Sequence, residues 1–174
     1  ADGERKSYDE IVKLLSLTCE NTELPVLHGS ANFLSDRYTP EPSEAADWMI
    51  QTVKKYPEEP VYIVALGAIT NVASAFLKAP EIRENTVVIW LGANLPEVGK
   101  NIDEFNLRED ISAGQVLFDS GAVIVLLPMA VTANVYIAQT EMKDFLQRSS
   151  LPVCSYLHEE WCGYMGEEAH GKVI

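Results

Sequence analysis

Three short apolar runs decide the fold: PVYIVALG at residues 60–67, NTVVIWLGA at residues 85–93 and GAVIVLLP at residues 121–128. None of them alternates between polar and apolar residues, which is typical of strands covered on both faces. Glycine or proline stands near the end of each run and interrupts a regular strand. The three runs therefore predict strands of one sheet.

Helical patterns fill the space between these strands. Residues 68–80 follow the first run directly, residues 110–121 lie between the second and third runs, and Asp110 stands where a helix N-cap is expected. Strands that alternate with helices need right-handed crossover connections, which produce a parallel sheet. The sequence therefore predicts the α/β class, with an open, mostly parallel sheet, helices on both faces and a Rossmann-like core.

The N-terminal third of the chain predicts further elements. Residues 7–19 and residues 43–56 have helical periodicity, with Ser43 as the N-cap of the second helix, and residues 24–29 predict a short strand. Residues 31–43 form one long polar loop. A loop of this length is consistent with an insertion over a site or with a linker, and both interpretations stay open.

Composition limits the class of protein. The chain has 174 residues, 47% of them hydrophobic, which predicts a single domain over residues 1–174, of the α/β class given above. Its formal net charge is −13. That charge repels phosphate backbones and anionic lipids, so we expect neither nucleic acid nor membrane as a partner. The cysteines match no CxxC spacing and no signal peptide is recognisable, which predicts reduced, buried thiols in a cytoplasmic protein. They are Cys19, Cys154 and Cys162.

A polar cluster, NIDEFNLRED at residues 101–110, follows the second strand. Ligands of open α/β sheets bind beyond the carboxyl ends of the strands, where this cluster is expected. In an extended segment Glu104 and Asn106 point the same way, while Phe105 points into the core. A carboxylate and an amide together suit neighbouring sugar hydroxyls. The alternative is that Glu104 is solvated and Asn106 shapes a turn; for Asp110 we expect the structural role of a helix cap.

Other kinds of site lack their motifs. The sequence contains no GxGxxG, no GxxxxGK[ST] and no GxSxG. These motifs would indicate a dinucleotide site, a phosphate-binding loop and a serine hydrolase, respectively.

Four motifs in order resemble one family, the inosine-uridine-preferring nucleoside hydrolases. The family's GPLTN corresponds to residues 67–71, its Met-Gly-Gly strand end to residues 90–92, its EFN to residues 104–106 and its DPEAA helix start to residues 110–114. The resemblance covers residues 7–132. The chain departs from the family where Ala68 replaces proline, where Leu91 replaces glycine, and in a shorter loop before EFN that lacks the usual Gly-Asn.

The resemblance implies hydrolysis of the N-glycosidic bond of ribonucleosides to ribose and free base, in purine or pyrimidine salvage. It implies that Glu104 and Asn106 bind ribose hydroxyls, with Asn94 or Asn101 as a further amide. It also implies a Ca²⁺ ion in the full-length enzyme, to which Leu66 would offer its backbone carbonyl, and a homo-oligomer.

One family motif is missing from the chain. The aspartates of DxDxGxDD, which hold the metal and supply the catalytic base in the family, occur nowhere in the sequence. We therefore expect a truncated, inactive middle portion of a longer hydrolase, with no catalytic residue of its own and no Ca²⁺ bound by this chain alone. The alternative is a complete, non-catalytic α/β protein that binds a sugar or another small molecule.

Overall fold

The computed structural model describes residues 2–18, 24–94 and 103–165. The chain forms two compact units. The first comprises Ala1–Arg5 and Leu27–Ala133, and the second comprises Lys6–Val26 and Asn134–Ile174. The first unit holds the sheet and every predicted site residue that the structure describes, and the second is helical.

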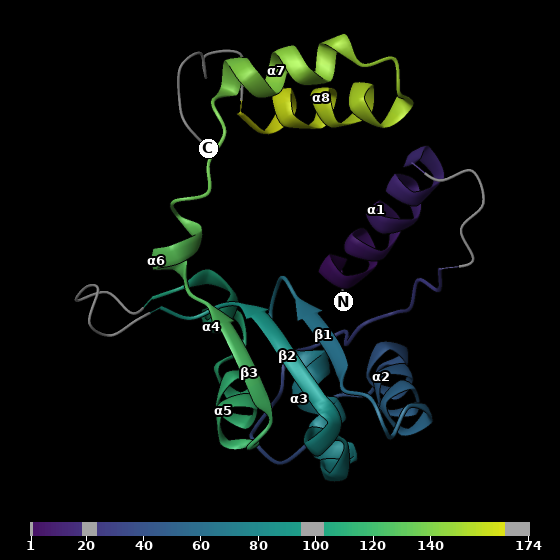
Figure 1. Cartoon of the computed structure of the whole chain (residues 1–174), viewed down its shortest axis with the longest axis vertical. Helices are drawn as coiled ribbons and strands as arrows, with labels where there is room; N and C mark the ends of the chain where they lie inside the picture. The colour runs from purple at the N-terminus through teal and green to yellow at the C-terminus, as the bar shows by residue number, and fades with distance from the viewer. Residues whose placement is uncertain (1, 19–23, 95–102, 166–174) are drawn as a thin grey trace. The chain divides into compact units, whose positions relative to one another are not determined.

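The sheet of the first unit is parallel, as predicted. Its strands β1 (Val61–Ala65), β2 (Thr86–Leu91) and β3 (Val123–Leu127) lie in the order β1-β2-β3 (Figure 1). Val64 is opposite Ile89, which in turn is opposite Val125. All three predicted strands are confirmed.

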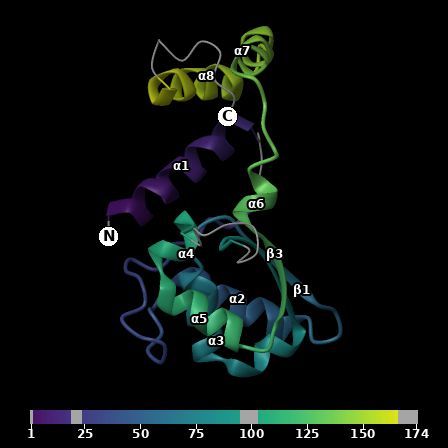
Figure 2. The same cartoon turned by 90° about the vertical axis from the view of Figure 1, so that its left-hand side faces the viewer.

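Three helices pack on one face of this sheet: α2 (Glu44–Lys55), α3 (Thr70–Lys78) and α5 (Ile111–Asp119). Figure 2 shows them on the same side of the strands. Trp90 and Val88 of β2 are fully buried under them, together with Leu117 of α5 and Phe76 of α3. Ser43 caps α2 by accepting a hydrogen bond from Ala46 N, as predicted. Burial of this apolar face is the main source of stability in the unit.

Alternate side chains of the same strands point to the opposite face. Tyr62, Val64 and Val123 are 63%, 62% and 61% exposed. Val125 and Leu127 lie on the same face and are also exposed. The two faces of one apolar sheet therefore differ strongly in burial.

Three short helices complete the first unit. The 3-10 helix η1 (Pro80–Asn85) joins α3 to β2, α4 (Phe105–Glu109) precedes α5, and α6 (Met129–Thr132) follows β3. The α4 helix corrects one prediction, because Phe105 lies in a helix, not in an extended segment.

Helices form the second unit. Most of α1 (Asp2–Thr18), together with α7 (Gln139–Arg148) and α8 (Pro152–Met165), belongs to it. Tyr156 of α8 donates its hydroxyl to the Glu10 carboxylate of α1, at 2.7 Å from Oε2. That hydrogen bond, followed by burial of the phenol, raises the pKa of Tyr156. The Lys13 ammonium lies 3.7 Å from the centre of the same ring, so α1 and α8 are joined by polar and cation–π contacts.

Three further predictions need correction. The first helix begins at Asp2, not at Ser7. Residues 24–29 form no strand, because their backbone groups bond elsewhere: His28 O accepts from Ala45 N at 3.0 Å, and His28 N donates to Glu44 at 3.2 Å. Cys154 is a buried free thiol as expected, but the free thiol of Cys162 is exposed.

Within the described ranges, no helix has the length and apolar character needed to cross a bilayer.

Candidate functional site

The strand ends that should form a site lie along one edge of the sheet. Because the strands are parallel, the residues after them meet at the same edge, here called the carboxyl-end rim. It comprises residues 66–71 after β1, residues 92–94 after β2 and residues 128–129 after β3. Gly92 N donates to Leu127 O at 3.3 Å, so the ladder between the last two strands continues into the rim.

The backbone after β2 has an unusual conformation. Gly92 lies against the Trp90 ring, and a Cβ atom added to it would come within 2.2 Å of that ring, which only glycine avoids. Ala93 then has a φ of 60°, in the left-handed region that costs a non-glycine residue about 1 kcal/mol. Conformations of this kind persist where the surroundings hold them and are concentrated at functional sites.

Glu104 holds this backbone in place. Its Oε2 accepts from Ala93 N at 2.7 Å and from Leu107 N at 2.9 Å, while Oε1 accepts from Asn106 N at 2.9 Å. The carboxylate is therefore the N-cap of α4 and also a clamp on the end of β2. The residue is only 6% exposed, so the alternative of a solvated Glu104 is wrong.

Asn106 reaches the same strand end from the first turn of α4. Its Nδ2 donates to Leu91 O at 2.8 Å, on the other side of Gly92 from the Ala93 contact. The structure thus brings Glu104 and Asn106 together. The prediction that Phe105 points into the core is wrong, however, because this side chain is 62% exposed. Leu107 is partly buried against the core instead, so close to Gly114 that a Cβ there would lie 2.4 Å from Leu107 Cδ1.

Asp110 caps α5, as the sequence predicts, and it also binds two other segments. Its Oδ1 accepts from Ala113 N at 2.9 Å and caps α5. Its Oδ2 accepts from the Thr70 hydroxyl at 2.6 Å and from Leu34 N at 2.9 Å. The buried carboxylate therefore joins the start of α5, the start of α3 and the long polar loop. The second and third of these links were not predicted, because no local pattern indicates them.

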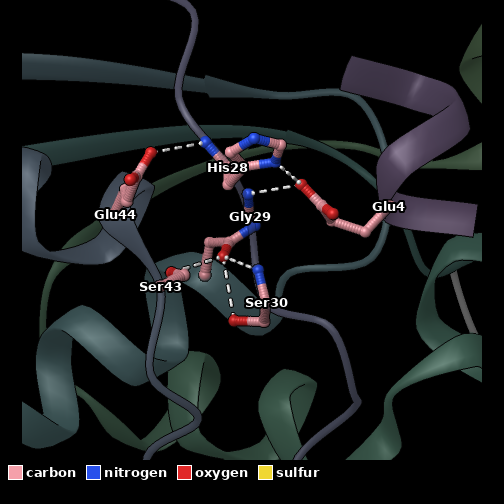
Figure 3. A network of polar contacts seen from close by, with 7 residues as sticks. Glu4, His28, Gly29, Ser30, Ser43 and Glu44 are labelled. Carbon is pink, nitrogen blue, oxygen red and sulfur yellow. Dashed lines mark hydrogen bonds and ion pairs between the residues drawn. The ribbon is translucent and has the colours of Figure 1, made fainter. Parts of the chain in front are cut away.

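Asn71, in the first turn of α3, is the centre of a second polar network. Its Oδ1 accepts from Ser30 N at 2.8 Å, from the Ser30 hydroxyl at 2.9 Å and from the Ser43 hydroxyl at 2.9 Å. Figure 3 shows Ser30 and Ser43 at this network. In the sequence Asn71 stands out only as part of the motif at residues 67–71, and no local pattern indicates its contacts.

Two carboxylates hold the neighbouring segment (Figure 3). Glu4 Oε1 lies 2.9 Å from His28 Nδ1 and accepts from Gly29 N at 3.1 Å. The hydrogen bond with the His28 ring is the main reason that the pKa of Glu4 lies below its ordinary value of 4.5. Glu44 accepts from His28 N, so carboxylates of α1 and α2 both fix this turn of chain.

The remaining predicted site residues have simpler positions. Leu66 follows β1 on the rim with 73% of its surface exposed, and Asn94 follows Ala93 and is partly buried. Asn101 lies outside the described residues. In the part of the chain that the structure describes, no group of three or more His, Cys, Asp or Glu residues could hold a metal ion.

Comparisons with known proteins agree on one family. The family described as inosine-uridine preferring nucleoside hydrolase matches residues 6–172. Probable uridine nucleosidase 2 of Arabidopsis thaliana is 30% identical over 132 residues, which are 74% of this chain and 40% of that protein. The pyrimidine-specific ribonucleoside hydrolase RihA of Escherichia coli O1:K1 is 31% identical over 140 residues, 78% of this chain and 45% of that protein.

A solved structure gives the same result. The purine-preferring ribonucleoside hydrolase from Gardnerella vaginalis superposes with a TM-score of 0.55 and 26% identity, over 76% of this chain and 44% of that one. The chain thus spans less than half the length of these relatives.

Proposed function

The chain belongs to the inosine-uridine preferring nucleoside hydrolase family, and from this we propose that it is part of an enzyme that hydrolyses ribonucleosides to ribose and free base. The observation that carries the proposal is the pairing of Glu104 and Asn106 at the carboxyl end of the middle strand. The names of the two relatives from Arabidopsis thaliana and Escherichia coli both describe nucleoside hydrolysis.

The proposed chemistry needs negative charge and hydroxyl contacts beside the sugar. Departure of the base leaves an oxocarbenium-like ribosyl cation, which a fixed carboxylate stabilises. Glu104 is fixed in this way by three backbone N–H groups. Its Oε1 accepts from Asn106 N, and a carboxylate oxygen has a second lone pair for a ribose hydroxyl. Asn106 would add amide contacts, with Asn94 or Asn101 as the further amide.

A calcium ion does not fit the described residues by themselves. Ca²⁺ takes six to eight oxygen ligands with several carboxylates among them. The Leu66 carbonyl is one backbone oxygen, the sequence has no DxDxGxDD, and residues 2–18, 24–94 and 103–165 contain no metal-binding group of three or more side chains. We propose that Ca²⁺ belongs to the full-length family enzyme and that this chain alone does not bind it. Isothermal titration with Ca²⁺ tests this, and a stoichiometric site of micromolar affinity would contradict it.

Several wider features are part of the same proposal. The protein would act on small ribonucleosides in cytoplasmic purine or pyrimidine salvage, as a homo-oligomer, with residues 1–174 as part of one larger α/β domain. The net charge of −13 supports a small-molecule substrate over a nucleic acid.

The test of activity uses Glu104→Gln and Asn106→Ala in a full-length protein that contains these residues. If both side chains hold ribose hydroxyls in the transition state, each change should lower kcat/KM for uridine or inosine by at least about tenfold. Asp103→Asn is the matched control, because this neighbouring carboxylate is exposed and pairs with Arg108. Release of free base is measured by chromatography.

The site geometry adds one requirement to this test. Glu104 is a buried helix cap, so Glu104→Gln is expected to lower stability too, and rates must be compared at a temperature where each variant is folded. A wild-type protein that binds ribose or ribonucleosides without releasing base would instead favour the second candidate, a non-catalytic sugar-binding protein. The pair of Glu104 and Asn106, whose carboxylate and amide suit sugar hydroxyls, fits this candidate as well.

A further inference from the structure

The two ends of the long polar loop donate hydrogen bonds to the same atom. Ser30 precedes residues 31–42 and Ser43 follows them, and both donate to Oδ1 of Asn71. One side chain of α3 therefore closes the base of the loop. A backbone N–H can only donate, so the Ser30 N contact requires that the Asn71 oxygen, not its nitrogen, faces the loop.

The same helix and its neighbour hold the body of the loop. Ser74 of α3 accepts from Glu41 N at 3.1 Å, and Asp110 accepts from Leu34 N. Midway along the loop, Arg37 forms an ion pair with Asp119 of α5. Polar anchors thus follow the loop over its whole course.

Apolar burial contributes little to this loop. Leu34 is buried, but Phe33 is 50% exposed and Tyr38 is 84% exposed. A loop with few buried side chains is positioned by its hydrogen bonds, and loss of the bonds at its base frees both ends together.

Gly29 permits the close approach on which the contact depends. A Cβ atom at this position would lie 3.1 Å from Asn71 Nδ2, closer than ordinary van der Waals contact. The segment can therefore lie directly against the first turn of α3, which begins at the carboxyl-end rim.

We propose that Asn71 is a positioning residue of the nucleoside site. It closes the Ser30–Ser43 loop and so holds residues 28–30 in a fixed place beside the rim. The inference rests on the proposed function, and Asn71 acts through the loop without touching the substrate. A rim that is fixed before binding loses less entropy when a ligand binds. Loss of the Asn71 contacts with Ser30 and Ser43 should therefore raise KM more than it lowers kcat.

The first test measures loop closure in this chain by amide hydrogen exchange. Asn71→Leu keeps the approximate size of the side chain and removes the acceptor, so the loop amides of Leu34 and Glu41, which donate to Asp110 and Ser74, should exchange at least about tenfold faster. Asn71→Asp keeps an oxygen acceptor for all three donors, and exchange should stay within about threefold of wild type.

Asn85→Leu is the matched control. Asn85 Nδ2 donates to Tyr56 O at 2.7 Å and to Glu59 O at 2.9 Å, contacts that do not involve the loop. The control should leave exchange of residues 31–42 unchanged. Unchanged exchange in Asn71→Leu, or equal acceleration in Asn85→Leu, would overturn the inference. If Asn71→Leu does not fold, Ser30→Ala removes one of the three bonds and should still accelerate exchange of the loop.

The second test uses a full-length enzyme that contains these residues. Asn71→Leu should raise KM for its ribonucleoside at least about fivefold and change kcat less than about threefold, with rescue by Asn71→Asp. Faster exchange with unchanged KM and kcat would overturn the positioning role but leave the proposed function intact. A folded wild-type enzyme that hydrolyses no ribonucleoside would remove the proposed function and the site, while the exchange result would still decide loop closure.

Discussion

The two faces of the sheet are built from the same strands and similar residues, yet within the described residues of the first unit helices pack on only one of them. On the helix-covered face Val88 and Trp90 are completely buried. On the opposite face Tyr62 and Val64 of β1 are more than 60% exposed. Parallel sheets are almost always covered on both faces, and an exposed apolar area of several hundred Å² usually marks an interface.

The apolar character of a strand residue and its burial are therefore separate properties. A run such as residues 60–67 predicts a strand, because β-branched and aliphatic side chains fit a pleated sheet. Whether a given side chain gains the roughly 1.5–3 kcal/mol of full burial depends on another element packing against it. The comparison can be tested by substitutions on each face.

The largest effect is expected from Trp90→Ala on the covered face. The ring is fully buried, lies against Gly92 and donates Nε1 to Gly67 O at 2.9 Å. Loss of the ring should leave a cavity and lower the free energy of unfolding by about 3–5 kcal/mol. Urea denaturation followed by circular dichroism measures it. A loss below about 1 kcal/mol would mean that this face is not the core.

Asp110→Ala should have the next largest effect. The change leaves the Ala113, Leu34 and Thr70 donors without their acceptor in a buried place, and it removes the cap of α5. We expect a loss of about 2–4 kcal/mol in the free energy of unfolding. Asp119→Ala is the control, because this carboxylate is exposed and forms a surface ion pair with Arg37, so its loss should cost less than about 1 kcal/mol. Similar losses in both variants would contradict the proposed importance of Asp110.

A matched pair of valines compares the two faces directly. Val88→Thr places a hydroxyl in the covered face and should cost about 1–3 kcal/mol. Val64→Thr makes the same change on the opposite face, where the side chain is 62% exposed, and should alter stability by less than about 0.5 kcal/mol. Thermal unfolding of both variants gives the difference. Equal costs would show that the opposite face is covered in solution.

The smallest effect concerns pH and a residue that belongs to neither face. The pKa of Glu4 is lowered in the folded chain, mainly by its hydrogen bond with His28. Its stabilising contribution is therefore present above the ordinary value of 4.5 and is lost as pH falls through the lowered folded value. Glu4→Gln should be slightly less stable than wild type near pH 6, and the difference should shrink below pH 4.5. A difference that stays constant with pH would show that the Glu4 charge contributes nothing.

The sequence predicted those parts of the fold that depend on neighbouring residues. The three strands, the caps at Ser43 and Asp110 and the long loop all follow local patterns, and the structure has them. The short strand at residues 24–29 fails for a tertiary reason, because His28 bonds with the start of α2.

The candidate site was predicted only in part. Glu104 and Asn106 were expected to lie together, and they do, at the end of β2. Their use as ribose ligands stays a prediction. Phe105 was expected to point into the core, but Leu107 is partly buried there instead, because α4 turns the segment and a 3.6-residue period replaces the two-residue period of a strand.

By itself the sequence determined the class of fold, the family and the residue types along the carboxyl-end rim. Periodicity, capping preference and motif order are local signals, and each is readable within a few residues. Only the tertiary structure decided that one face of the sheet is covered, that Asn71 closes a loop through Ser30 and Ser43, and that Asp110 reaches Leu34. These contacts join residues that are far apart along the chain, and whether they form depends on the packing of whole helices against the sheet.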